Sequence, residues 1–170
     1  MKFRHLRTSP WTPTFTWVGS EREAADQINS FHEDYPTRVN VSLLALADLW
    51  RKLDLTGGPN MWPLGYKIPS SRLLEIHHEV FGDTEFAGRW RRVRVVVGGH
   101  QPPLPADVPG LMGELEEAYR IMTLGDLKAW YYDFETIHPF EDGNGRVGGI
   151  IVAAYAHHFH PDRGWLAPNQ

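Results

Sequence analysis

The stretch HPFEDGNGR, residues 138–146, holds three side chains whose types suit the transfer of a phosphate-containing group. His138 can act as a base, because an imidazole accepts a proton near neutral pH. Asp142 offers hard carboxylate oxygens to a divalent cation, and Arg146 presents planar N–H donors that match phosphate oxygens. Each has a plainer explanation alone: a histidine suits a helix C-terminus, an aspartate caps a helix, and an arginine pairs with a surface carboxylate. Their convergence favours a functional site.

The sequence on either side of this stretch predicts two helices that present these groups. Apolar residues recur at helical spacing over residues 126–137 and again over residues 144–159. Gly143 lies between them and Gly145 at the start of the second, and both glycines allow positive φ and a close approach of the backbone to a ligand. The second helix then directs its first N–H groups into the loop, which favours an anion there.

The stretch resembles the signature loop of Fic-domain proteins, whose pattern is His-x-Phe-x-Asp/Glu-Gly-Asn-Gly-Arg-x-x-Arg. Every position from His138 to Arg146 fits this pattern, but Gly149 stands where the final arginine belongs. Residues 73–91 are similar to the family's core helix and the turn after it, and residues 93–109 to its β-hairpin flap. The resemblance therefore covers about residues 70–160.

The resemblance implies a protein nucleotidyl transferase (AMPylation) that moves AMP from Mg-ATP to a Ser, Thr or Tyr hydroxyl of a target protein. His138 would be the catalytic base and Asp142 the ligand of Mg²⁺. The target would bind by strand addition to the flap near Val95–Val97. A glycine at position 145 matches the nucleotidyl-transferring branch and implies attack at the α-phosphorus, whereas the Doc-like phosphorylating branch has a lysine there. The phosphate cradle would consist of Gly143, Asn144, Gly145 and Arg146.

Gly149 leaves several outcomes open. In Fic transferases the missing arginine contacts the terminal phosphates of ATP and stabilises charge on the leaving group. In one outcome the chain uses ATP weakly, and in another it uses a different diphosphate-containing donor of the UTP, GTP or CDP-choline type. An alternative from another class is a catalytically degenerate Fic domain that binds a nucleotide or a protein. In a further outcome another basic group substitutes, and the candidates are Arg89, Arg91, Arg92 and Arg94.

We expect no internal inhibitory helix of the pattern Ser/Thr-x-x-x-Glu-Gly/Asn. Ser71 and Glu75 have the spacing, but Ile76 follows them. This expectation is compatible with restraint by a separate inhibitor or antitoxin.

The composition is that of a single folded domain with few features of other classes. The chain has 170 residues, 42% of them hydrophobic, with seven Trp and eight Phe. A net charge of −4 argues against a general nucleic-acid binder. There is no cysteine, no apolar run of signal-peptide length and no stretch of ~20 apolar residues. We therefore expect no membrane association and a cytoplasmic location, or secretion as an effector without a standard signal peptide. The histidines near the C-terminus match no zinc-ligand spacing.

The expected fold class is mainly α, with a single Fic-like helical domain and a small β-hairpin flap. Residues 1–69 are interpreted as an N-terminal arm and helices packed on the core, residues 70–160 as the Fic-like core, and residues 161–170 as a C-terminal tail. Besides the two helices that flank the loop, helices are predicted over about residues 20–35, 41–53, 72–81 and 109–122.

Overall fold

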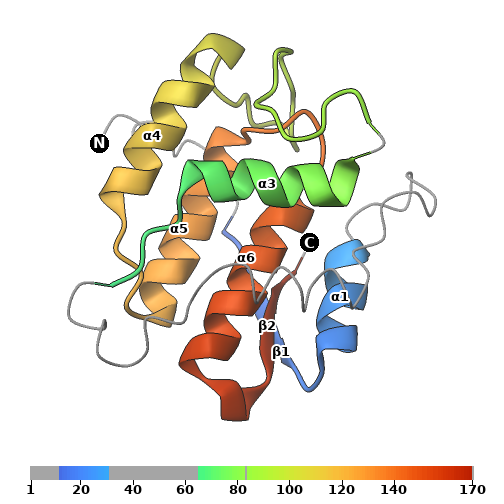
Figure 1. Ribbon diagram of the computed structural model, residues 1–170, viewed down its shortest axis with the longest axis vertical. Coiled ribbons are helices and arrows are strands. Elements are labelled where there is room, and N and C mark those ends of the chain that lie inside the picture. The colour runs from blue at the N-terminus through green and yellow to red at the C-terminus, as the bar shows by residue number, and fades with distance from the viewer. Residues whose placement is uncertain (1–11, 31–64, 83, 170) are drawn as a thin grey trace.

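The computed structural model describes residues 12–30, 65–82 and 84–169, and their architecture confirms the mainly α fold class (Figure 1). None of the described helices is both long and apolar enough to cross a bilayer. The α-helices are α1 (Glu21–Asn29), α3 (Ser70–Phe81), α4 (Val108–Ala118), α5 (Leu124–Ile137) and α6 (Asn144–Phe159). Two 3-10 turns, η4 (Pro105–Asp107) and η5 (Pro161–Arg163), and two strands, β1 (Phe15–Val18) and β2 (Trp165–Pro168), complete the described elements.

Helix α6 is the centre of the core and contacts α1, α3, α5 and β2. In Figure 1 it lies between α5 and α1, and it is buried along most of its length. Gly148 allows the close approach of α5, because a Cβ there would lie 2.8 Å from the Tyr131 ring and 3.0 Å from the Phe134 ring. The two helices that flank the loop therefore form one closely packed unit.

The helix starts follow from local chemistry. Thr123 and Asp126 form a capping box at the start of α5, each side chain accepting from the other's backbone N–H, at 3.1 Å and 3.0 Å. Ser20 caps α1 by accepting from the N–H of Glu23 at 3.2 Å. Pro69 is the N-cap of α3, and the Ser70 hydroxyl donates to the carbonyl of Met112.

The expected β-hairpin flap within residues 93–109 is less regular than a two-stranded ladder. It is a hairpin closed by one antiparallel bridge, Val97 to His100, across a turn whose two glycines have positive φ. The predicted helix over residues 41–53 lies outside the described residues.

The two-stranded sheet lies elsewhere and joins the two ends of the described chain. Strands β1 and β2 pair antiparallel, with Phe15 opposite Pro168 and Val18 opposite Trp165. The segment that we interpreted as a C-terminal tail thus contains a buried strand. Trp165 anchors it by stacking on His157 with ring centroids 4.0 Å apart.

Candidate functional site

The loop between α5 and α6 has the predicted helix, loop, helix form. His138 ends α5 in the left-handed region with φ 50°, and its N–H donates to the carbonyl of Phe134 at 2.9 Å. Gly143 precedes α6 with φ 86°. A Cβ at Gly143 would lie 2.2 Å from the Phe81 ring, so only glycine fits this position without rearrangement.

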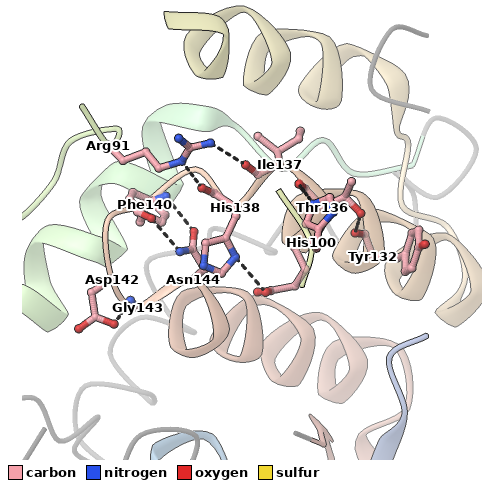
Figure 2. A network of polar contacts seen from close by, with 11 residues as sticks. Arg91, His100, Tyr132, Thr136, Ile137, His138, Phe140, Asp142, Gly143 and Asn144 are labelled. Carbon is pink, nitrogen blue, oxygen red and sulfur yellow. Dashed lines mark hydrogen bonds and ion pairs between the residues drawn. The ribbon is translucent and has the colours of Figure 1, made fainter. Parts of the chain in front are cut away.

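Asn144 closes the loop on itself. Its Oδ1 accepts from the N–H of Phe140 at 2.8 Å, and its Nδ2 donates to the carbonyl of Phe140 at 2.9 Å (Figure 2). Phe140 is fully buried beneath. In this structure the amide side chain thus positions the loop, whereas the backbone N–H of Asn144 begins α6, where no side chain caps the helix.

His77 supports the loop from α3, a role that sequence reasoning missed. Its ring stacks on Phe140 at 4.0 Å and on Phe81 at 4.6 Å. Nδ1 accepts from the N–H of Gly88 at 2.9 Å, so Nε2 carries the proton and donates to the carbonyl of Asp142 at 2.9 Å. Burial lowers the pKa of His77 to about 4, which keeps the ring neutral.

Asp142 and Arg146 lie together at the start of α6. One carboxylate oxygen of Asp142 accepts from the N–H of Gly143 at 2.7 Å, and the other lies 3.4 Å from an Arg146 nitrogen. The described residues contain no cluster of three or more ligand side chains. Asp142 is a loop carboxylate whose oxygens are of the kind that bind a hard divalent cation such as Mg²⁺.

His138 borders a cavity of about 400 Å³ between the loop and the flap. Its side chain is 16% exposed, and its buried Nδ1 lies 3.6 Å from Oε2 of Glu135 on α5. Sequence reasoning did not single out Glu135, although its spacing of three residues on one helix could have indicated the contact. The cavity is lined by His138, Glu141, Asp142, Gly143, Asn144, Gly145 and, from the flap, Val95, Val96 and Val97.

Arg91 is not free to bind phosphate, and this candidate substitute for the missing arginine is wrong. Its side chain is buried and donates to the carbonyl of His138 at 2.7 Å and, more weakly, to that of Ile137 at 3.4 Å (Figure 2). It also donates to the carbonyls of Val93 and Pro103. Arg91 therefore ties the flap base to the C-terminus of α5, where a cation is favourable.

The other candidate arginines line different cavities. Arg89 and Arg92 border a cavity of about 600 Å³ beside Trp90. Arg94 borders a third cavity, next to Gln101. Neither cavity includes a residue of the signature loop.

Gly149 faces α1 and not the loop cavity. A Cβ at this position would lie 3.0 Å from Cγ1 of Ile28, a fully buried residue. A larger side chain therefore requires Ile28 to move. The packing of α1 against α6 gives a physical reason for glycine where the Fic pattern has its second arginine.

The comparison with protein families decides the identity of the fold. The model of the Fic/DOC family matches residues 67–156, which include α3, the flap, the loop and most of α6. The chain belongs to the Fic/DOC family. The signature loop, the core helix and the flap fall within the matched residues, as the resemblance predicts.

The curated relatives are named protein adenylyltransferase Fic. The protein from Culex quinquefasciatus is 38% identical over 88 residues, which cover 47% of this chain and 18% of that protein. The protein from Drosophila erecta is 39% identical over 94 residues, covering 51% of this chain and 19% of that protein. The matched part thus spans about a fifth of the length of these relatives.

Solved structures support the same fold. A Fic family protein from Desulfovibrio desulfuricans superposes with a TM-score of 0.55 at 20% identity, covering 94% of this chain and 46% of that one. A Fic domain containing signaling protein from Bacteroides thetaiotaomicron gives a TM-score of 0.55 at 17% identity, covering 92% and 60%. At these identities the likeness concerns the fold alone.

Proposed function

We propose that the domain is a protein nucleotidyl transferase that moves AMP from Mg-ATP to a Ser, Thr or Tyr hydroxyl of a target protein. One observation carries the proposal: His138, Asp142 and the N-terminus of α6 border a single cavity beneath the flap. A base, a carboxylate and an anion-binding helix terminus are the groups that this reaction needs. The names of the curated relatives support the same class of activity.

His138 would act as the general base through Nε2, since its Nδ1 is buried against Glu135. Nε2 accepts the proton of the target hydroxyl, and the oxygen attacks the α-phosphorus. The bond from that phosphorus to its bridging oxygen breaks, and pyrophosphate leaves. A fixed base raises the rate because an unassisted hydroxyl is a poor nucleophile.

The start of α6 would bind the donor phosphates. The first-turn N–H groups of α6 have no intrahelical partners, and its Asn144 and Gly145 border the cavity. Arg146 adds positive charge behind the loop. Asp142 would hold Mg²⁺, which neutralises phosphate charge when bound. Asn144 would contribute its backbone, since its side chain holds Phe140.

A donor other than ATP is the second candidate, and Gly149 is the observation that favours it. Position 149 faces Ile28, and Arg91 is engaged with backbone carbonyls. Neither position therefore supplies a cation for the terminal phosphates of a triphosphate. A donor whose leaving group carries less charge would suit the site better.

The target would bind along the flap by strand addition near Val95–Val97. Val96 is 73% exposed, and its neighbours border the cavity. An extended segment placed there would lie across the cavity from the loop, with its hydroxyl near His138.

Calorimetry of donor binding tests the proposal. ATP, UTP, GTP and CDP-choline are titrated with Mg²⁺ into the wild type and into Asp142→Ala, with Asp162→Ala as a control that removes an exposed carboxylate far along the chain. We expect one donor to bind and Asp142→Ala alone to weaken it. Binding that is equal in the wild type and Asp142→Ala, or no binding of any donor, would contradict the proposal.

A further inference from the structure

Glu135 and His138 leave buried polar atoms facing each other. The Glu135 side chain is 12% exposed, and its Oε2 lies 3.6 Å from Nδ1 of His138. Within the described residues, Glu135 Oε1 and His138 Nδ1 are buried and have no hydrogen-bond partner. A buried carboxylate oxygen without a hydrogen-bond donor is costly, and Oε1 of Glu135 is such an atom.

The backbone fixes how these two side chains meet. They are three residues apart at the end of α5 and share one helix face. The left-handed conformation of His138 is held by its N–H bond to Phe134 and by the Arg91 bond to its carbonyl. The separation is about 0.6 Å longer than a strong hydrogen bond, a gap that a small side-chain rotation closes.

We propose that Glu135 positions His138 by accepting a hydrogen bond from its Nδ1–H, an inference that rests on the proposed function of His138 as a base. The contact selects the tautomer with the proton on Nδ1 and leaves the Nε2 lone pair directed to the target hydroxyl. When Nε2 takes the hydroxyl proton, the carboxylate stabilises the resulting imidazolium. The proton stays on the imidazole, and Glu135 remains ionised throughout.

Four other charged residues lie near His138. Arg91 contacts its backbone carbonyl from the flap base. Glu141 and Asp142 border the same cavity, and Arg146 on α6 pairs with Asp142. Of these four residues and Glu135, only Glu135 is paired with the imidazole ring itself.

The direct test measures the tautomer of His138 by ¹⁵N-resolved NMR of the histidine rings, with His138→Gln used to assign its signals. Glu135→Gln removes the charge but keeps an acceptor. Glu135→Met removes both the charge and the acceptor and keeps a side chain of similar size. Glu141→Gln is the matched control, since it removes a carboxylate that borders the cavity without contact to the ring.

We expect the Nδ1–H tautomer in the wild type. Glu135→Gln should keep this tautomer, because its amide oxygen remains an acceptor for Nδ1–H. Glu135→Met should lose the tautomer preference, whereas Glu141→Gln should keep it. The inference is overturned if the wild type lacks the Nδ1–H tautomer, a result that does not depend on any variant folding, or if folded Glu135→Met retains the preference.

Kinetics give a second and separable readout. In the transfer assay Glu135→Gln should lower kcat about 10- to 100-fold with the donor KM unchanged. Glu135→Asp should restore part of the rate. A wild type that shows the Nδ1–H tautomer but transfers nothing would refute the proposed function and leave the pairing standing. Transfer by a wild type that lacks this tautomer would refute the pairing alone.

Discussion

The loop of residues 138–146 is enclosed by buried side chains, whereas the flap of residues 93–104 rests on the domain through contacts at its base and its turn. In the loop, the side-chain amide of Asn144 bonds to both the N–H and the carbonyl of Phe140, and His77 Nε2 donates to the carbonyl of Asp142. In the flap, one bridge closes the turn, and His100 Nε2 bonds to the carbonyl of Thr136 at 3.0 Å (Figure 2).

This difference suits the two tasks that the proposed function assigns to the loop and the flap. Chemistry at phosphorus requires groups fixed within fractions of an ångström, and interior contacts provide that fixation. Recognition of a target segment requires an accessible edge, and the flap exposes Val96 and the backbone around it. The two sides of one cavity are therefore stabilised by different amounts of buried contact.

The largest expected effect is a loss of stability, and it compares one glycine of the loop with one glycine of the flap. Both Gly143 and Gly98 have positive φ, but a Cβ at Gly143 would lie 2.2 Å from Phe81, whereas nothing lies within 4 Å of one at Gly98. Gly98→Ala should cost about 1–2 kcal/mol through backbone strain alone. Gly143→Ala should cost about 1–3 kcal/mol more, because it adds overpacking. Urea denaturation measures both, and equal costs would refute the contrast.

His77 should make the free energy of unfolding depend on pH. Its pKa is about 4 in the folded state and 6.5 when unperturbed, mainly because burial disfavours the charged ring. The unfolded state therefore binds the proton first, and stability falls as pH drops from 6.5 through 4. Relative to His77→Gln, the wild type should lose up to about 3 kcal/mol over this window.

Denaturation of the two proteins at a series of pH values checks this expectation. Burial also lowers the pKa of His158, which adds a loss of the same sign in both proteins. A pH slope shared by wild type and His77→Gln would show that His77 is not the source.

The packing of Gly149 against Ile28 predicts coupling between α6 and α1. Gly149→Arg should destabilise the domain by overpacking, and the cost should be smaller in the background of Ile28→Ala. The double-mutant cycle should give an interaction free energy of about 1–2 kcal/mol. Additive effects in denaturation experiments would mean that α1 does not exclude the arginine. Donor binding by the double variant would also show whether the restored side chain reaches phosphate.

The smallest expected effect tests the flap. The N–H of Val97 donates to His100 across the turn, and because N–H groups alternate in direction along a hairpin we expect the N–H of Val96 to point outward. Val96→Pro removes that donor and should raise the KM for the target about three- to tenfold, whereas Val96→Ala should not. Stability should change by less than about 0.5 kcal/mol. An unchanged KM in Val96→Pro would contradict strand addition.

The sequence predicts the loop well because its determinants are local. The spacing of residues 138–146, the glycines and the flanking apolar periodicity lie within one continuous segment. The helix ends and the positive φ of Gly143 follow from that segment alone, whereas the αL conformation of His138 was not expected and involves Arg91 from the flap base.

The supports of the loop are not predictable in this way, because they come from distant parts of the chain. His77 lies on α3, and in sequence it was indistinguishable from an isolated core histidine. Arg91 belongs to a run of arginines that has the pattern of a solvated strand. In the structure its side chain instead donates hydrogen bonds to carbonyls at the end of α5 and in the flap. Strand β2 was interpreted as a tail because its partner, β1, lies near the opposite end of the sequence.

Label transfer tests the central claim most directly. The protein and an extract containing its targets are incubated with Mg²⁺ and ATP labelled at either the α- or the γ-phosphate, using the wild type, His138→Ala and the exposed-histidine control His78→Ala. We predict covalent protein labelling from the α-phosphate only, in the wild type and in His78→Ala, with a loss of about 10²- to 10⁴-fold in His138→Ala. Labelling from the γ-phosphate, undiminished labelling by His138→Ala, or no labelling by the wild type would contradict an AMP transferase built around His138.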